Sequence, residues 1–350
     1  MRVVWVSDTF EQLNGIAVYI KRIIPLLQKY IDIRLVTGRV KERYKFPVSP
    51  LPYVPVPMLQ DYDIIIPTFR KIDADIVHIH TGYILGLYSS LLGNKKVVTT
   101  HLHPYHLLEG IFGHRQPRFL QKLAWRYVIS FFNRFDVVVC QTNATKEMFR
   151  KRGLKPRTEV VPNGINTLES VENIKPTVNF REKYNIRGDF ALFLGRIDAS
   201  KGIDWVIEVA RKLPDREFFI VGKGTLEKKI PKLENIHFYN YLGYEDKIAA
   251  FYEATMLLMP SKVETEGIVA QEAMLFKKPV LISNNEVLRE VVGKGGIVCN
   301  SIEELAENTE FLFENEKLRE EIGEKALEEV KKRDINKSVE KLVKIYESLL

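Results

Sequence analysis

Short apolar runs alternate with longer amphipathic segments along almost the whole chain, and this alternation narrows the possible folds more than any other feature. Each apolar run has about the length of a buried strand, whereas the segments between them show the spacing of amphipathic helices. Strands and helices in alternation favour parallel sheets covered by helices on both faces. Two sets of six strands are predicted: Val3–Ser7, Ile33–Thr37, Ile76–His80, Val97–Thr100, Val137–Cys140 and Glu159–Val161, then Phe190–Leu194, Phe218–Val221, Ile236–Phe238, Met256–Met259, Val280–Ile282 and Ile297–Cys299.

A chain of 350 residues is expected to form two domains. Between the two sets of strands lies Pro162-Asn-Gly-Ile-Asn, followed by a polar stretch to about Phe180, which indicates a linker. We therefore predict an α/β protein with two doubly wound Rossmann-like domains, residues 1–164 and 165–336, that face each other across a cleft. The last helix, at about 337–350, is amphipathic and is predicted to pack back on the first domain.

The segment Phe46–Pro67 contains six prolines. Proline lacks a backbone donor and breaks helices, so this segment is predicted to be an irregular connection rather than a buried strand. A long connection inside a compact domain is usually functional.

The composition, 45% apolar and 28% charged, is that of a globular protein with a sizeable core. The net charge of +7 favours an anionic partner, but no nucleic-acid-binding module is recognised. Cys140 and Cys299 lie far apart, which argues against a disulfide framework or thiolate metal site and fits a reducing cytoplasm. The first residues predict a strand rather than a signal peptide, and no apolar run of about 18 residues predicts a membrane span. Abundant Lys and Glu with few Gln indicate a thermophile.

The segment from Pro260 to Glu272 carries two carboxylates, Glu264 and Glu272, on either side of Gly267. An apolar strand precedes it, so it is expected to contain a tight loop and then the start of a helix. Unpaired N–H groups and the positive end of the macrodipole make a helix start a seat for phosphate. A carboxylate one turn further, such as Glu272, could accept both hydroxyls of a ribose. This segment therefore predicts a site for a sugar nucleotide.

Two cations follow the first strand of the second set in Gly195-Arg196-Ile-Asp-Ala-Ser-Lys201-Gly. Arg and Lys together can neutralise a diphosphate without a metal, and the alternative is a pair of surface cations at a helix start. Gly222 follows a strand and could let the backbone approach a base or ribose, or could simply make a turn. Gly15 could let a phosphate approach a helix start, or could be an ordinary helix-start glycine.

Five of the seven histidines fall in one window: His78, His80, His101, His103 and His106. His-x-His on a strand can bind zinc, which makes a metal-dependent hydrolase a rival interpretation, but buried core histidines are favoured. His101 follows a strand end, where open α/β sheets place their ligands, and could contact a sugar hydroxyl or help to position the acceptor. Asp73-Ala-Asp75 matches a metal–diphosphate pattern and is interpreted as a cap before the next strand.

The segment Gly113–Phe135 is basic and contains no Asp or Glu. Its apolar stripe is predicted to face the core: Leu120, Leu123, Ala124, Tyr127, Val128, Phe131 and Phe132. Arg118, Lys122 and Arg126 form a basic ridge beside Trp125. This cationic, Trp-bearing face suits an anionic membrane surface, or is an ordinary solvated helix face. The chain is thus expected in the cytoplasm, and a peripheral position on the inner membrane face follows from the first alternative.

These motifs together resemble the GT-B fold retaining glycosyltransferases of family 4, over nearly the whole length of the chain. Glu264-Thr-Glu-Gly-Ile-Val-Ala-Gln-Glu272 resembles the E-x7-E signature of that family, and it is combined here with the Arg196 and Lys201 segment. Val161-Pro-Asn-Gly-Ile-Asn is similar to the inter-domain segment. Asp75-Ile-Val-His-Ile-His followed by Thr99-Thr-His matches the family in order and spacing.

The resemblance implies roles for individual residues. Glu272 would bind the donor ribose, and Arg196 and Lys201 the diphosphate. Glu264 would hold the donor sugar and phosphates together with backbone groups, and His101 would lie beside the transferred sugar. The backbone positions implied in donor binding are Gly15, Gly267, Ile268 and Val269. No metal or other cofactor is implied.

Two positions depart from the family pattern. Many members have a second glycine where this chain has Asn14, and many have phenylalanine where it has Glu266. The Glu-Thr-x-Gly form, Ser-Asp-Thr-Phe and the proline-rich segment are most similar to members that act on lipids. We therefore predict a retaining transferase that uses a UDP- or GDP-hexose and an acceptor hydroxyl, on a membrane lipid or on a soluble molecule. A nucleotide-sugar epimerase, a glycoside hydrolase and a non-catalytic nucleotide-sugar-binding regulator are alternatives.

Overall fold

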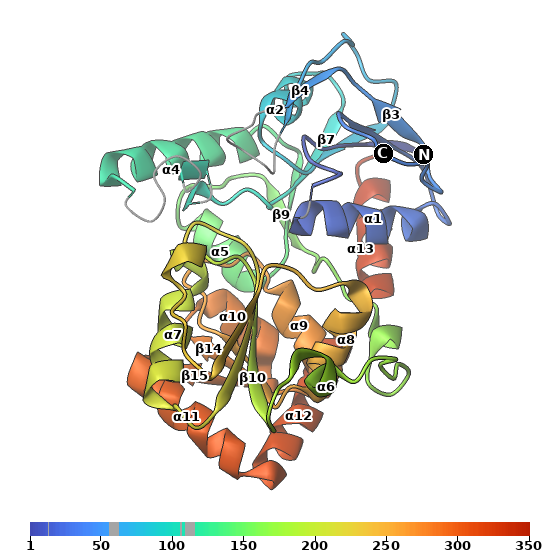
Figure 1. Cartoon of the computed structure of the whole chain (residues 1–350). Helices are drawn as coiled ribbons and strands as arrows, with labels where there is room; N and C mark the ends of the chain where they lie inside the picture. Colours follow the sequence, from blue (N-terminus) through green and yellow to red (C-terminus); the bar gives the residue numbers. More distant parts are fainter. Residues whose placement is uncertain (13, 56–62, 106, 109–115) are drawn as a thin grey trace. The chain divides into compact units, whose positions relative to one another are not determined.

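The computed structural model describes residues 1–12, 14–55, 63–105, 107–108 and 116–350. These residues divide into two compact units, and Figure 1 shows both. The first unit contains Met1–Gly164 and Ile335–Leu350, and the second contains Ile165–Asp334. Each unit is built around its own parallel sheet.

In the described residues, the main sheet of the first unit has seven parallel strands in the order β3-β2-β1-β6-β7-β8-β9. A separate antiparallel pair joins β4 to β5. The elements, in chain order, are β1 (Arg2–Val6), α1 (Gly15–Leu27), β2 (Asp32–Thr37), β3 (Val48–Pro50), β4 (Tyr53–Pro55), β5 (Asp63–Ile65), β6 (Ile76–Ile79), α2 (Ile84–Ser90), β7 (Lys95–Thr99), α4 (Arg118–Phe132), β8 (Val137–Cys140), α5 (Asn143–Arg150), β9 (Arg157–Val160) and α13 (Ile335–Glu347).

Alternation along the strands divides the core of the first unit into two layers, because successive side chains point to opposite faces of a sheet. Trp5 of β1 packs in the cluster that contains the buried residues of α1 and α13. Its neighbour Val4 packs in the opposite cluster, with buried residues of α2, α4 and α5. Helices α1 and α13 are in contact, and Figure 1 shows them crossing each other. The strands appear in the sequence as continuous apolar runs, rather than as alternating apolar and polar residues, because helices cover both faces of the sheet.

The end of the chain is fixed to the first sheet by a buried hydrogen-bond group around Tyr346 of α13. The indole Nε1 of Trp5 donates to the Tyr346 hydroxyl at 3.0 Å, and this hydroxyl lies 2.5 Å from Nδ1 of His78. His78 Nε2 lies 2.8 Å from Oγ1 of Thr99. Burial lowers the pKa of His78, so the ring is neutral and its nitrogens serve these hydrogen bonds. The segment that contains His78 and the C-terminal helix α13 are therefore parts of one core.

The proline-rich segment contains more structure than the sequence predicted. Strand β3 joins the edge of the main sheet, and β4 and β5 form a hairpin whose connecting residues, 56–62, lie outside the described chain. Proline is tolerated at a sheet edge because one side of an edge strand needs no donors. The prediction of an irregular connection was wrong for these strands because composition cannot show that a strand lies at an edge.

The second unit contains, in the described residues, a six-stranded parallel sheet in the order β12-β11-β10-β13-β14-β15. Its elements are η1 (Thr167–Glu169), α6 (Phe180–Tyr184), β10 (Phe190–Leu194), η2 (Ala199–Lys201), α7 (Ile203–Lys212), β11 (Glu217–Val221), η3 (Glu227–Lys229), β12 (Ile236–Tyr239), α8 (Tyr244–Glu253), β13 (Met256–Met259), α9 (Ile268–Leu275), β14 (Val280–Ser283), α10 (Glu286–Val292), η4 (Gly293–Gly295), β15 (Gly296–Cys299), α11 (Ile302–Glu314) and α12 (Glu316–Lys331). All twelve predicted strands are confirmed, with ends that differ by up to two residues.

Helices cover both faces of the second sheet as well. Leu192 of β10 packs in the cluster that holds the buried residues of α6, α8, α9, α10 and α12. The adjacent Phe193 packs in the other cluster, with α7 and α11. The strand order reverses at β10, which has β11 on one side and β13 on the other. Such a reversal is the point at which open α/β sheets bind ligands.

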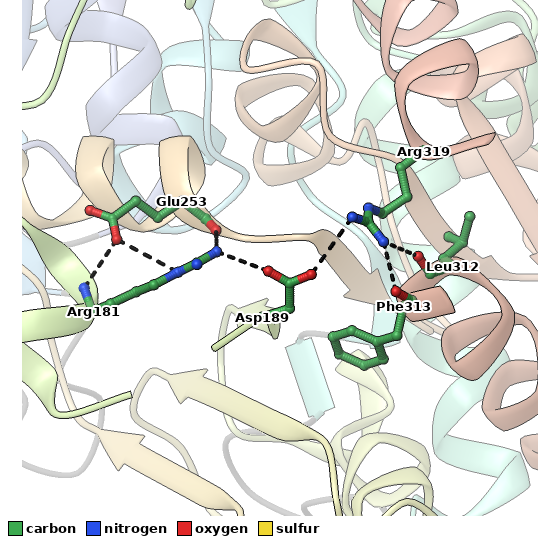
Figure 2. A network of polar contacts seen from close by, with 6 residues as sticks. All are labelled: Arg181, Asp189, Glu253, Leu312, Phe313 and Arg319. Atoms are coloured by element: carbon green, nitrogen blue, oxygen red, sulfur yellow. Dashed lines mark hydrogen bonds and ion pairs between the residues drawn. The ribbon is translucent and has the colours of Figure 1, made fainter. Parts of the chain in front are cut away.

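Figure 2 shows a polar network that joins four helices of the second unit. Glu253 at the end of α8 accepts hydrogen bonds from the backbone N–H groups of Phe180 and Arg181, at 2.6 and 3.1 Å, and so caps the start of α6. Asp189 pairs with Arg181 at 3.2 Å and with Arg319 of α12 at 3.6 Å. Arg319 also donates to two carbonyl groups near the end of α11. The network satisfies helix ends that would otherwise lack partners.

Lys278 lies in the field of this network, and its titration predicts a pH-dependent stability. Burial lowers the pKa of Lys278 to about 8, and the two arginines add to this effect. Between pH 8 and the ordinary lysine pKa, the unfolded chain binds more protons than the folded chain, so stability from this group rises with pH. We expect wild type to gain stability over Lys278→Met by about 2 kcal/mol between pH 7.5 and 9.5 in urea unfolding. An unchanged difference over this range would contradict the prediction, and Lys332→Met, at an exposed position on the same unit, serves as the control.

Candidate active site

The loops that carry the predicted donor residues lie at one edge of the second sheet. Strands β11, β10 and β13 are neighbours and parallel, so their carboxyl ends meet there. Strand β10 leads into Gly195 and Arg196, β11 into Gly222, and β13 into the loop that ends at Gly267. The topology thus brings three separate motifs of the sequence to the reversal point of the sheet.

Gly222 allows two of these loops to touch. Its φ of +147° is rare for other residues, and a Cβ atom placed on it would lie 1.8 Å from the carbonyl oxygen of Gly195. Its own N–H donates to Tyr239 O at 2.9 Å. The glycine is therefore required by close packing of backbone against the segment that carries Arg196. Whether it also contacts a base or ribose stays a prediction.

Arg196 is held by an aspartate that the sequence analysis did not single out. Nη1 of Arg196 lies 3.2 Å from Oδ2 of Asp198, and the arginine side chain is 43% exposed. The other oxygen of Asp198 accepts hydrogen bonds from the backbone N–H and the hydroxyl of Thr225, at 2.9 and 2.8 Å. Asp198 thus fixes one end of the guanidinium and joins it to the β11 loop. Its position two residues after Arg196, inside the motif, was a usable signal.

Lys201 and Glu264 form a close ion pair, with Nζ 2.5 Å from Oε1. Both side chains are largely covered, at 18% and 8% exposure. Lys201 ends η2 and Glu264 lies in the loop after β13, so the contact joins two motifs that are far apart in sequence. The carboxylate offsets part of the lysine charge and holds the ammonium group in place. The sequence analysis predicted both residues but not that they are partners.

Helix α9 begins at the left-handed Gly267, with φ 80° and ψ 57°. No side chain caps this helix, so its first turn, with Ile268 and Val269, has the character of an anion site. Glu266, just before the glycine, is buried. Glu272 lies further along α9, and its Oε1 accepts a hydrogen bond from Nζ of Lys247 at 3.0 Å. Lys247 comes from α8, and nothing in the local sequence could have pointed to it.

In the first unit, Asn14 explains one departure from the family pattern. Its Oδ1 accepts a hydrogen bond from Ala17 N at 3.0 Å and caps α1, and its Nδ2 donates to Oγ1 of Thr9 at 2.8 Å. Gly15 is exposed as the first residue of the capped helix. Asn14 therefore supplies a side-chain cap that a second glycine could not supply.

Of the four histidines of the window that the structure describes, three are buried and His101 is partly exposed. His78 and His80 are fully buried, whereas His101 is partly exposed at the carboxyl end of β7. Burial lowers the pKa of His101 to about 3. His103 is buried and accepts a hydrogen bond from Tyr105 N at 3.2 Å, and His106 lies outside the described residues. In the described chain, no group of three His, Cys, Asp or Glu side chains is arranged to hold a metal ion.

The Asp73-Ala-Asp75 pattern directly precedes β6, so it lies at the amino ends of the parallel strands of the first sheet, whereas His101 lies at their carboxyl ends. Asp75 accepts a hydrogen bond from the backbone N–H of Arg2 at 2.7 Å, and Asp73 pairs with the Arg2 side chain. Both contacts belong to the start of β1 and β6, as expected for caps.

Helix α4 differs in two ways from its predicted arrangement, although residues 113–115 before it lie outside the described chain. Ala124, Val128, Phe131 and Phe132 are buried as predicted, but Leu123 and Tyr127 are 53% and 36% exposed. The predicted apolar stripe included exposed residues because periodicity alone does not show how far a neighbouring element covers a helix.

Trp125 also differs from the prediction, because it does not stand free beside the basic ridge. The Arg152 guanidinium lies 4.0 Å from its ring centroid, and the indole also packs on Phe149. The outer face of α4 instead presents Phe119, which is 64% exposed, with Leu123 and the exposed cations. These cations are Arg118, Lys122 and Arg126. We call this set, Arg118, Phe119, Lys122, Leu123 and Arg126, the α4 face.

Comparison with protein families identifies the class. Residues 13–168 match the model described as Glycosyltransferase Family 4, and residues 173–329 match the model described as Glycosyl transferases group 1. The fold and these matches define an enzyme, a glycosyltransferase of the GT-B architecture. The chain belongs to the glycosyltransferases that combine these two regions, Glycosyltransferase Family 4 in the first and Glycosyl transferases group 1 in the second.

Two curated relatives illustrate the range of the family. An uncharacterized glycosyltransferase of Methanocaldococcus jannaschii is 26% identical over 368 aligned positions, which cover 100% of this chain and 99% of the relative. The alpha-monoglucosyldiacylglycerol synthase of Acholeplasma laidlawii is 24% identical over 277 positions, which cover 70% and 68% of the two chains. The resemblance seen in the motifs is thereby confirmed.

Two solved structures share the fold. Sucrose-phosphate synthase from Thermosynechococcus elongatus has a TM-score of 0.79 at 15% identity, covering 100% of this chain and 99% of the other. The Anabaena protein HepE, solved in complex with UDP-glucose, has a TM-score of 0.76 at 16% identity and covers 100% of both chains. At these identities the likeness establishes the GT-B fold, with its two Rossmann-like domains.

The close contact at Gly222 predicts a stability difference between two glycine substitutions. Gly222→Ala would force the loop away from Gly195, whereas Gly188→Ala, also at positive φ, meets nothing within 4 Å. We expect Gly222→Ala to lower the free energy of unfolding by about 1–3 kcal/mol more than Gly188→Ala, measured by urea titration. Equal losses would show that the two loops do not pack as described.

Proposed function

We propose that this protein transfers a hexose from a UDP- or GDP-sugar to an acceptor hydroxyl with retention of anomeric configuration. The observation that carries the proposal is the set of charges at the reversal point of the second sheet. Arg196, anchored by Asp198, and Lys201, anchored by Glu264, lie on loops at the same edge as the start of α9. Fixed cations and an uncapped helix start are suited to a diphosphate. The UDP-glucose complex of HepE supports this type of donor.

In the proposed reaction, the bond between the sugar carbon and the diphosphate oxygen breaks, and a bond to the acceptor oxygen forms on the same face. The proton of the acceptor hydroxyl passes to the departing phosphate oxygen. Arg196, Lys201 and the start of α9 stabilise the negative charge that develops on the diphosphate. Since two cations and a helix dipole carry this charge, the proposal requires no divalent metal. Glu272, held by Lys247, is assigned to the ribose.

The anchoring carboxylates give the site a defined geometry before any donor binds. Asp198 and Glu264 are almost completely covered, so the cations they hold lose few alternative positions when a phosphate arrives. Arg196 has five N–H donors in a planar fork, a geometry that matches phosphate oxygens. Preorganisation of this kind is the main source of transition-state stabilisation in charge-separating reactions.

The charge assignment predicts a large effect of Arg196→Ala. A panel of UDP- and GDP-hexoses is first scored by thermal shift, because a ligand of the native state raises its melting temperature. With the donor so found, and with EDTA present throughout, we expect wild type to transfer the sugar and Arg196→Ala to lose about 10²-fold or more in kcat/KM. The variant should retain the wild-type melting temperature without donor, since its ion pair is partly exposed.

The control is Arg187→Ala, which removes an exposed arginine of the same unit that precedes β10. It should transfer at the wild-type rate. Full activity of Arg196→Ala would refute the assignment of that residue, and loss of wild-type activity in EDTA would refute the metal-free mechanism.

We further propose that the acceptor is a membrane lipid and that the α4 face binds an anionic bilayer. Exposed Phe119 and Leu123 can enter the interface while the three cations meet lipid phosphates. Residues 116–135 contain no Asp or Glu to weaken this attraction. The Acholeplasma relative is named for a glucosyldiacylglycerol product, and a Streptococcus pneumoniae relative, 26% identical, is an alpha-galactosylglucosyldiacylglycerol synthase. In the described residues, no helix has the length and hydropathy to cross a bilayer.

A soluble acceptor is the second candidate, and vesicle binding separates the two. We expect wild type to co-sediment with phosphatidylglycerol vesicles at moderate salt, and Phe119→Ser/Leu123→Ser to remain largely in the supernatant. The matched control is Phe311→Ser, which removes a phenylalanine of the second unit that is 51% exposed, and it should sediment like wild type. If wild type sediments with the vesicles at none of the salt concentrations, the membrane proposal is refuted and a soluble acceptor is favoured.

A further inference from the structure

Four polar side chains form a chain of hydrogen bonds at the carboxyl edge of the first sheet. His80 directly follows β6, Thr100 and His101 follow β7, and Gln141 follows β8, and these three strands are neighbours. The Thr100 hydroxyl donates to Oε1 of Gln141 at 3.0 Å, and Nε2 of Gln141 lies 3.3 Å from Nδ1 of His101. Nε2 of His101 lies 3.4 Å from Nδ1 of His80. The sequence analysis assigned no role to Gln141 and interpreted His80 as a core histidine, so it predicted neither contact with His101.

The direction of these hydrogen bonds fixes the place of the proton on His101. Because Oε1 of Gln141 accepts from Thr100, its amide nitrogen faces His101, and an amide nitrogen can only donate. Nδ1 of His101 must therefore be the unprotonated nitrogen. The ring is neutral, since burial places its pKa at about 3, and its single proton is on Nε2.

The next ring continues the same pattern. His101 donates from Nε2 to Nδ1 of His80, so the proton of the neutral His80 is on its own Nε2. That buried atom has no hydrogen-bond partner among the described residues. His80 cannot easily rotate to change this, because its ring packs on Trp5 with centroids 4.1 Å apart and on Tyr19 at 5.7 Å. A fixed His80 therefore presents a fixed acceptor to His101.

We propose that Gln141 and His80 are positioning residues that hold His101 as the neutral Nε2–H tautomer, so that His101 serves as a fixed hydrogen-bond donor. The contact of His101 with an oxygen of the sugar nucleotide or of the acceptor molecule rests on the proposed function, whereas the tautomer does not. The bond to His80 is long, at 3.4 Å, which leaves the N–H able to share its hydrogen with a ligand oxygen. His101 then takes no part as general acid or base, and the proton of the acceptor goes elsewhere.

A merely structural network is the alternative, and nitrogen chemical shifts of the imidazole rings distinguish the two. The protein is labelled with ¹⁵N-histidine, and the His101 signals are assigned by their absence from His101→Asn. Wild type, without any donor, should show the Nε2–H tautomer of His101 from pH 5 to 8. The histidines beside this ring, His78 and His80, are neutral over that range because burial lowers the pKa of each.

Gln141→Glu is the decisive variant, because a carboxylate can only accept. We expect it to draw the proton of His101 to Nδ1 and to raise the pKa of that ring, so that the imidazolium form appears on acidification. Gln116→Glu, at another buried glutamine of the same unit, should leave the His101 signals unchanged. Gln141→Leu, which adds no charge, should populate both neutral tautomers and gives the answer if the glutamate variant does not fold.

The activity of the same variants shows whether the tautomer matters for transfer. The kcat/KM of Gln141→Glu should be low above the raised pKa, where Nε2 of His101 carries no proton, and should recover as the pH falls through that pKa and the imidazolium restores Nε2–H, whereas that of wild type stays flat. Nδ1–H in wild type, or unchanged His101 shifts in both Gln141 variants, would overturn the positioning role. A shifted tautomer with an unchanged pH profile would retain the hydrogen-bond assignment and refute its use in catalysis. Since the spectra need no donor, these results are independent of whether Arg196→Ala disables transfer.

Discussion

The candidate site depends on one constraint, which is that β10 has parallel neighbours on both sides and the strand order reverses there. Parallel strands end at the same edge, so the loops after β10, β11 and β13 must meet, however far apart they lie in the sequence. The backbone contact at Gly222 and the ion pair between Lys201 and Glu264 are consequences of that meeting. Neither contact could form if the crossovers placed other strands beside β10.

The charged side chains at this edge of the second sheet form ion pairs. Three cations have a carboxylate partner: Arg196 with Asp198, Lys201 with Glu264, and Lys247 with Glu272. A partly buried pair contributes little net stability, because desolvation offsets most of the attraction. Its value here is geometric, since a held cation loses little freedom when an anion binds. Removing Lys201 would leave Glu264, which is 8% exposed, without its cation, so this pair is expected to act as a unit.

The buried histidines of the first unit are held by neutral hydrogen bonds, whereas the charged residues of the candidate site in the second unit are held by ion pairs. Burial suppresses protonation of His78, His80 and His101, and each ring then has one donor and one acceptor nitrogen. One group of bonds fixes Tyr346 and with it the last helix, and the other orients His101. His78 in β6 thus serves the fold, and His80 just after that strand serves the site. The zinc interpretation of this pattern finds no third ligand in the described residues.

The sequence by itself determined the strands, the fold class and the family, because continuous apolar runs and the E-x7-E spacing are local patterns. It also placed Arg196, Lys201, Glu264 and Glu272 in the right loops and helix, although their catalytic roles stay predictions. Only the tertiary structure decided which side chains are partners, such as Lys247 for Glu272, and which face of α4 is open. It alone revealed β3, β4 and β5 in the proline-rich segment. The physical reason is that a contact across a sheet edge depends on strand order, and strand order leaves no mark on the residues that flank each strand.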